Sequence, residues 1–68
     1  MVREVLRFIT ECKAISFVLT DHAEYLKEFA SQVDEEYLEW LASQLEKYAR
    51  LLLEMGERME MIATGEKG

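Results

Sequence analysis

The feature that most constrains this 68-residue chain is a heptad pattern of apolar residues in both of its halves. Alternating spacings of three and four residues are typical of an α-helix that carries one apolar stripe. Sixteen of the seventeen positions are apolar, and His22 is the exception. We call this set the heptad residues: Val5, Phe8, Cys12, Ile15, Leu19, His22, Leu26, Phe29 and Val33 in the first half, and Leu38, Leu41, Leu45, Tyr48, Leu52, Met55, Met59 and Ile62 in the second.

The two stripes are out of phase with each other. From Val33 to Leu38 the pattern steps by five residues, which rotates the stripe by about 140° on a straight helix. A turn between the stripes removes this mismatch. Asp34 can cap the second helix, and Val33 and Leu38 can form a hydrophobic staple across its start. A single helix that continues through Tyr37 remains an alternative, because no Gly or Pro enforces the break.

These boundaries predict one helical-hairpin domain over residues 1–64. The first helix spans about 2–31, the turn about 32–35 and the second helix about 35–63. Gly65 is a typical C-terminal stop signal, so residues 65–68 are expected to form a short flexible tail. A weaker start signal at Asp21 would split the first helix, but the heptad phase continues through it without interruption.

Small residues follow every second heptad residue. Seven of these eight positions are small, and they repeat every seven residues: Ile9, Ser16, Ala23, Ala30, Ala42, Ala49, Gly56 and Ala63. Such a repeat lets two helix backbones approach toward the short end of the usual range of about 8 to 10 Å. We therefore expect an all-α fold, in which two long helices pack antiparallel along a close-packed seam of Ala, Gly and Ser, with the heptad stripes of the two helices facing each other in the same seam.

Large apolar residues also lie away from the heptad positions, and one hairpin cannot bury them all. Exposed apolar surface of this kind usually marks an interface, and chains this short commonly complete their core by oligomerising. We expect a homodimer in which two hairpins form a four-helix bundle. The candidate dimer contacts are Val18, Tyr25, Leu51 and Phe17, together with Tyr37.

Composition excludes several classes of function. The chain has 8 Lys and Arg against 14 Asp and Glu, a net charge of −6, which disfavours binding to nucleic-acid phosphates. The single cysteine, Cys12, cannot form an internal disulfide, and the charge content argues against a membrane span. These features favour a soluble protein of the reducing cytoplasm.

The residues that carry chemistry are few and isolated. His22 has no metal-ligand partner at a characteristic spacing, so we interpret it as a core residue that hydrogen-bonds to Tyr48 across the hairpin. Cys12 reads as a small buried hydrophobe, since reactive thiols need electropositive and partly exposed surroundings. No nucleophile, phosphate-binding loop or carboxylate pair emerges. We expect no enzymatic activity, no metal and no cofactor.

The charge is concentrated around the predicted turn. Residues 21–46 contain eight acids and one lysine, a net charge of −7, so the rest of the chain carries +1. Tyr37 and Trp40 stand there among Glu35, Glu36 and Glu39. An acidic tip with exposed aromatic residues can bind a basic groove on a protein partner. The leading hypothesis is a small regulatory protein, an inhibitor or adaptor of the kind that mobile elements encode.

Two further functions remain open. The plan of the chain, a hairpin with small residues at heptad spacing, resembles the Rop family of dimeric RNA-binding regulators. The resemblance implies an RNA-binding face on the first helix, here carrying Arg3, Arg7, Lys13 and Phe17, although Asp21, Glu24 and Glu28 occupy the other half of that face. The third hypothesis is a subunit of a larger helical assembly, in which the off-seam apolar residues are buried.

Overall fold

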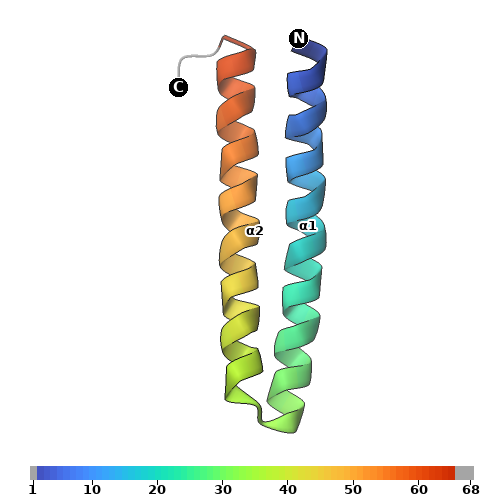
Figure 1. The fold of residues 1–68 in the computed structure, drawn as a ribbon, viewed down its shortest axis with the longest axis vertical. Helices are drawn as coiled ribbons and strands as arrows, with labels where there is room; N and C mark the ends of the chain where they lie inside the picture. The colour runs from blue at the N-terminus through green and yellow to red at the C-terminus, as the bar shows by residue number, and fades with distance from the viewer. Residues whose placement is uncertain (1, 66–68) are drawn as a thin grey trace.

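Two long antiparallel helices make up the fold (Figure 1). The computed structural model describes residues 2–65, with helix α1 at Val2–Val33 and helix α2 at Glu36–Ala63. The all-α hairpin is confirmed, and the helix ends lie within about two residues of those predicted. Gly65 has a φ of 78° and ends the chain's second helix as expected, whereas residues 66–68 of the predicted tail lie outside the described residues.

The turn between the helices is formed by a C-terminal motif of α1 rather than by an N-terminal cap on α2. Asp34 has a φ of 54°, and the amide of Glu35 donates to the carbonyl of Ala30 at 2.9 Å, while the Asp34 amide donates to Ser31 at 3.4 Å. This pair of bonds is a Schellman motif, which satisfies the last carbonyls of a helix. The prediction that Asp34 caps α2 is therefore wrong: Glu35 occupies the N-cap position, without a side-chain cap bond.

The residues at the predicted small positions form the seam between the helices, except Ala63, which is exposed at the end of α2. Cys12 lies beside them, and a Cβ at Gly56 would stand 3.4 Å from the Cβ of Cys12, so the two backbones approach closely there. Ser16 is also buried, and its hydroxyl donates to the carbonyl of Ala49 at 2.7 Å. The buried residues of the described chain are Ile9, Cys12, Ser16, Ala23, Ala30, Ala42, Ala49 and Gly56.

The larger heptad residues do not lie in this seam, which corrects the expectation that the heptad stripes face each other. They lie beside it, because the backbones meet along the small positions and the heptad residues are rotated from those positions to one side, by about 40 to 100°. Leu19 of α1 and Leu45, Tyr48, Leu52 and Met55 of α2 line one shallow groove, so both stripes share a face. We call this face the open face; its most exposed members are Phe8, Ile15, Phe29, Val33, Tyr48, Met55 and Ile62.

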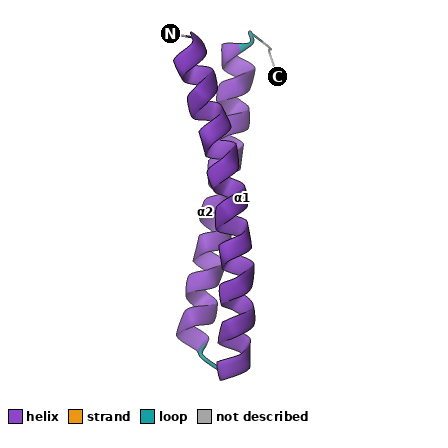
Figure 2. Cartoon of the chain, turned by 90° about the vertical axis from the view of Figure 1, so that its right-hand side faces the viewer, coloured by secondary structure: helices purple, strands orange, loops and turns teal. Residues whose placement is uncertain are grey.

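The molecule is consequently one layer thick. Its dimensions are 48 × 20 × 12 Å, and the two helices cross at a shallow angle when the hairpin is viewed from the side (Figure 2). The radius of gyration is 15.2 Å, against about 11 Å for a compact domain of this length. Among the described residues no large side chain is fully buried. A second layer is what most domains use to complete a core.

Candidate protein-binding surfaces

The tip of the hairpin carries an aromatic pair on the first turn and a half of α2. The rings of Tyr37 and Trp40 are stacked, with their centroids 6.0 Å apart and their planes at 16°. The pair forms because side chains three residues apart are neighbours on a helix. Both remain accessible, with Tyr37 64% and Trp40 55% exposed. Two large aromatic side chains thus stand together on the surface, where each loses little conformational freedom on binding a partner.

Carboxylates surround this aromatic pair. Glu35, Glu36 and Glu39 are all exposed, and Glu36 and Glu39 lie in the first turn of α2, where the helix dipole favours negative charge. We call these three residues together with Tyr37 and Trp40 the tip patch. The structure brings together the five residues that the sequence singled out. The patch combines two exposed aromatic side chains with three carboxylates.

The open face is the second candidate surface. Leu51 lines its groove, and Val18, Tyr25 and Tyr37 precede heptad residues by one position, which places them on its outer margin. All four are exposed, as a contact between subunits would require. The sequence predicts dimer contacts at this margin, together with Phe17, and this stays a prediction. It missed the face itself, because the heptad residues were assigned to the seam.

Phe17 lies on the other side of the hairpin. Ser16 is buried in the seam, and its neighbours Ile15 and Phe17 are rotated by about 100° in opposite directions from it. Ile15 therefore belongs to the open face, whereas Phe17, which is 71% exposed, does not. The structure separates Phe17 from Val18, Tyr25 and Leu51, with which the sequence had grouped it.

His22 and Tyr48 do not form a core pair in the single chain. The Nδ1 atom of His22 lies 2.8 Å from the carbonyl of Val18, one turn earlier in α1, and the residue is exposed. Tyr48 is 66% exposed. The expectation of a buried hydrogen-bonded pair is wrong for the hairpin alone, because both residues occupy the open face rather than the seam.

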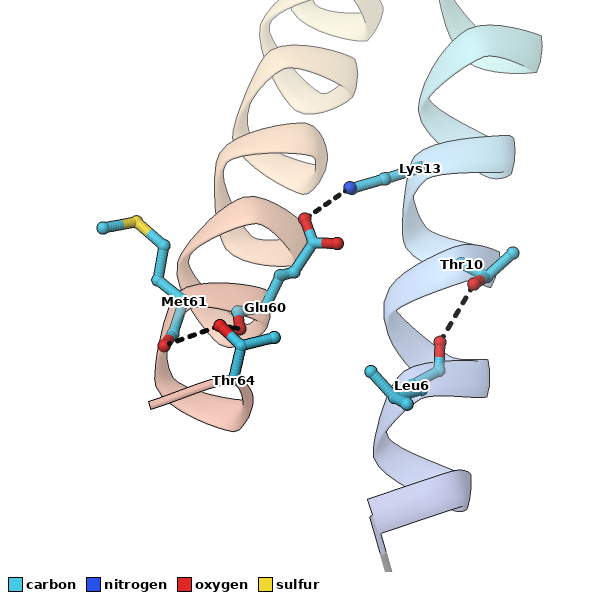
Figure 3. A network of polar contacts seen from close by, with 6 residues as sticks. All are labelled: Leu6, Thr10, Lys13, Glu60, Met61 and Thr64. Atoms are coloured by element: carbon cyan, nitrogen blue, oxygen red, sulfur yellow. Dashed lines mark hydrogen bonds and ion pairs between the residues drawn. The ribbon is translucent and has the colours of Figure 1, made fainter. Parts of the chain in front are cut away.

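The polar edge of the hairpin is tied by two cross-helix ion pairs. Lys13 Nζ lies 2.7 Å from Glu60 Oε1 (Figure 3), and Lys27 Nζ lies 2.8 Å from Glu46 Oε1. Glu60 also belongs to the end of α2, where its carbonyl accepts the Thr64 hydroxyl at 2.9 Å. Each pair is partly exposed, so each contributes about 0 to 1 kcal/mol. Both pairs join α1 to α2 on the side of the hairpin opposite the open face.

The candidate nucleic-acid face is weakened by one of these pairs. Lys13 is engaged by Glu60, which leaves Arg3 and Arg7 as the exposed cations of that set. Phe17 is exposed, as a stacking contact would require. The four residues therefore do not form a continuous basic surface.

The side chains of Cys12 and Ser16, two of the residues considered for chemistry, lie in the seam. Cys12 is buried, as expected, and Ser16 is committed to the Ala49 carbonyl. Residues 2–65 contain no group of three His, Cys, Asp or Glu side chains placed to hold a metal ion. Neither α1 nor α2, as described, has an apolar stretch long enough to cross a membrane.

Comparisons of the chain with known proteins give no match. No protein-family model matches it, and no curated protein or solved structure matches it significantly. The likeness to Rop is thus a likeness of sequence plan alone, and function must be argued from the surfaces described above.

Proposed function

We propose that this protein is a small, acidic, non-enzymatic interaction protein that binds a basic surface of another protein through the tip patch. The observation that carries the proposal is the stacked, exposed pair of Tyr37 and Trp40 within three carboxylates. Trp and Tyr are enriched among the residues that dominate binding energy. An inhibitor or adaptor needs no more than such a site on a rigid support.

The position of Trp40 supports a separate binding surface. Trp40 precedes the buried Ala42 by two positions, so its side chain points about 160° away from that of Ala42. It therefore lies on the outer side of α2. A contact that covers the open face would leave it accessible. The carboxylates nearby would then steer a basic partner, and their contribution would fall as salt concentration rises.

The experiment compares two aromatic truncations. Tagged wild-type protein is used to capture binding proteins from the host lysate. Each captured protein is then purified and titrated with the wild-type protein and with Trp40→Ala. We expect the dissociation constant to rise at least tenfold, with helicity and mass unchanged. Phe17→Ala is the matched control, because Phe17 is an even more exposed aromatic residue of the same hairpin, at 71% against 55% for Trp40, and lies outside the tip patch.

Two outcomes would overturn the tip as the binding site. One is equal loss of binding in Phe17→Ala and Trp40→Ala. The other is binding that does not weaken between 50 and roughly 300 mM salt, since an acidic patch on a basic partner must be screened.

We also propose that the working form is a homodimer, in which two hairpins make a four-helix bundle. The single layer of helices and the number of exposed apolar residues support it. Sedimentation equilibrium at micromolar concentration measures the mass directly. A monodisperse 8.0 kDa species would contradict this part of the proposal and leave the tip patch untouched.

The RNA-binding alternative and the assembly-subunit alternative become outcomes of these experiments. A gel shift of structured RNA at low salt that is lost in Arg7→Ala would favour the first. A chain that aggregates unless it is produced together with another helical protein would favour the second.

A further inference from the structure

We infer that the open face is covered by a second copy of this chain, with the two hairpins arranged head to tail. Head to tail means that the tip of one hairpin lies beside the end of the other that holds the start of α1 and the end of α2, here called the base. The inference rests on the proposed homodimer and adds where the second copy sits and how it is oriented.

The surface area of the chain matches what a second copy would bury. The chain exposes 5627 Å², whereas a compact monomer of its mass exposes about 4,500 Å². The surplus is roughly 1,100 Å², and a stable dimer buries about 800 Å² on each partner. One partner of the same dimensions is therefore enough to account for the surplus.

The open face is also suited to pairing with itself. Both helices contribute heptad residues to it along nearly their whole length, and side chains from α1 and α2 line its groove together. A dimer with two-fold symmetry uses the same patch on both subunits. Heptad residues of four helices would then interleave in one core, which is how four-helix bundles are packed.

The distribution of charge along the hairpin favours a head-to-tail dimer over the other symmetric arrangement, which is head to head. The half of the hairpin nearer the tip, residues 21–46, carries −7, and the remainder carries +1. A head-to-head dimer sets two strongly negative halves side by side, whereas a head-to-tail dimer sets each beside a nearly neutral half. Repulsion between like charges disfavours the first arrangement, most strongly at low salt.

Symmetry then determines the neighbouring helices. When the hairpins lie head to tail across a two-fold axis, α1 packs against α1 of the second copy and α2 against α2, each pair antiparallel. Val18 lies near the middle of α1, so it would meet its own counterpart near the axis. Val18, Tyr25 and Leu51 thus become contacts between subunits, whereas Tyr37 stays with Trp40 in the tip patch.

The first test places a charge on either side of the hairpin. Ile15→Lys puts a lysine on the open face, and Phe17→Lys puts one on the opposite side, at residues that are 48% and 71% exposed. We expect Ile15→Lys to raise the dimer dissociation constant at least a hundredfold, and Phe17→Lys to change it less than threefold. Met55→Lys, on α2, must repeat the first result.

These variants separate the placement from the dimer itself. A wild-type monomer overturns both the dimer and the placement. A wild-type dimer that tolerates Ile15→Lys and Met55→Lys but is lost in Phe17→Lys overturns the placement alone. Circular dichroism confirms that each variant is still helical.

The second test measures orientation. Ser31 is exposed near the tip, and Cys12→Ala removes the native thiol, so Ser31→Cys in that background carries one spin label per chain. In a head-to-tail dimer the two labels lie roughly 40 Å apart, because each is about 13 residues from the middle of α1. A distance below about 25 Å would show a head-to-head dimer and overturn the orientation while leaving the placement intact.

Discussion

The seam and the open face come from the same repeat but have opposite properties. The seam consists of small residues that are almost completely buried within one chain, and the open face consists of larger residues that stay half exposed. The difference shows that the size of a side chain, and not only its hydrophobicity, decides which residues face the other helix of the hairpin. Two helices approach most closely where their side chains are smallest, and the bulky stripes are left for another layer.

Enlarging a seam residue should have the largest effect. Ala49 is 1% exposed, so Ala49→Leu forces a bulky side chain between two helices that are already in contact. We expect the free energy of unfolding to fall by about 3 kcal/mol, near the upper end for overpacking. Urea unfolding followed by circular dichroism measures it.

The matched control for this variant is Ala14→Leu, which adds the same atoms at an exposed position of α1. Its stability should change by less than about 0.5 kcal/mol. Similar losses in both variants would mean that the seam is not the site of close packing.

His22→Leu tests the open face in the same terms. His22 is exposed in the single chain, but the proposed dimer buries it among apolar residues. Replacing a buried polar group with leucine should lower the dimer dissociation constant about tenfold, which corresponds to about 1.4 kcal/mol. Analytical ultracentrifugation over a dilution series measures the constant.

The corresponding change on the other side of the hairpin is Thr10→Leu, which should leave the dissociation constant unchanged. A weaker dimer in His22→Leu would contradict the expected gain. It would show instead that the histidine makes a specific bond in the interface.

Sequence reasoning could establish most of the fold, and the reasons are physical. The phase break after Val33 favours a turn over one continuous helix, and the small residues that follow heptad positions favour close approach of two helices; the structure contains both. The small residues also identified the seam, since Ala23, Ala42 and Ala49 are buried. The five residues of the tip patch could be placed together because they are close in sequence, and their role in binding stays a prediction.

Other features depended on information that a one-dimensional pattern does not hold. The heptad residues were placed in the seam because the pattern specifies a stripe on each helix but not the rotation of each helix toward its partner. Asp34 was read as a cap because its side chain suits one, whereas its backbone adopts the left-handed conformation that ends α1. The pairing of Lys13 with Glu60 depends on the register between α1 and α2, because the two residues are 47 positions apart in sequence.

Removing one bond from the seam should have a smaller effect than enlarging it. Ser16→Ala deletes the hydrogen bond from the hydroxyl to the Ala49 carbonyl but adds no volume. The Ala49 carbonyl remains part of the α2 backbone in this variant. We therefore expect the free energy of unfolding to fall by about 1 kcal/mol. Thermal unfolding measures it, with Ser43→Ala at an exposed position as the control. A loss as large as that of Ala49→Leu would mean that the bond, rather than close packing, holds the seam.

The turn lies outside both the seam and the open face, so Asp34→Gly should stabilise the hairpin without changing the packing of either surface. A residue with a φ of 54° is strained unless it is glycine, and we expect a gain of about 0.5 to 1 kcal/mol. Asp34→Ala removes the same charge but keeps the strain, so its stability should not rise. If both variants gain equally, the benefit comes from reduced repulsion among the tip carboxylates instead.

Gly56→Ala should have the smallest effect, and it measures how much space the seam still holds. The added Cβ would lie 3.4 Å from the Cβ of Cys12 and 3.6 Å from the carbonyl oxygen of Ile9, which is close but ordinary contact. Alanine is favoured over glycine within a helix by about 1 kcal/mol, and slight crowding should offset part of this gain. We expect a net stabilisation of about 0.5 kcal/mol by urea unfolding. Gly56→Val, which is larger, should instead destabilise the hairpin by more than about 1 kcal/mol. If valine were tolerated as well as alanine, the helices would have room to separate at this level, and the contrast between a closed seam and an open face would hold only nearer the tip, around Ala42 and Ala49.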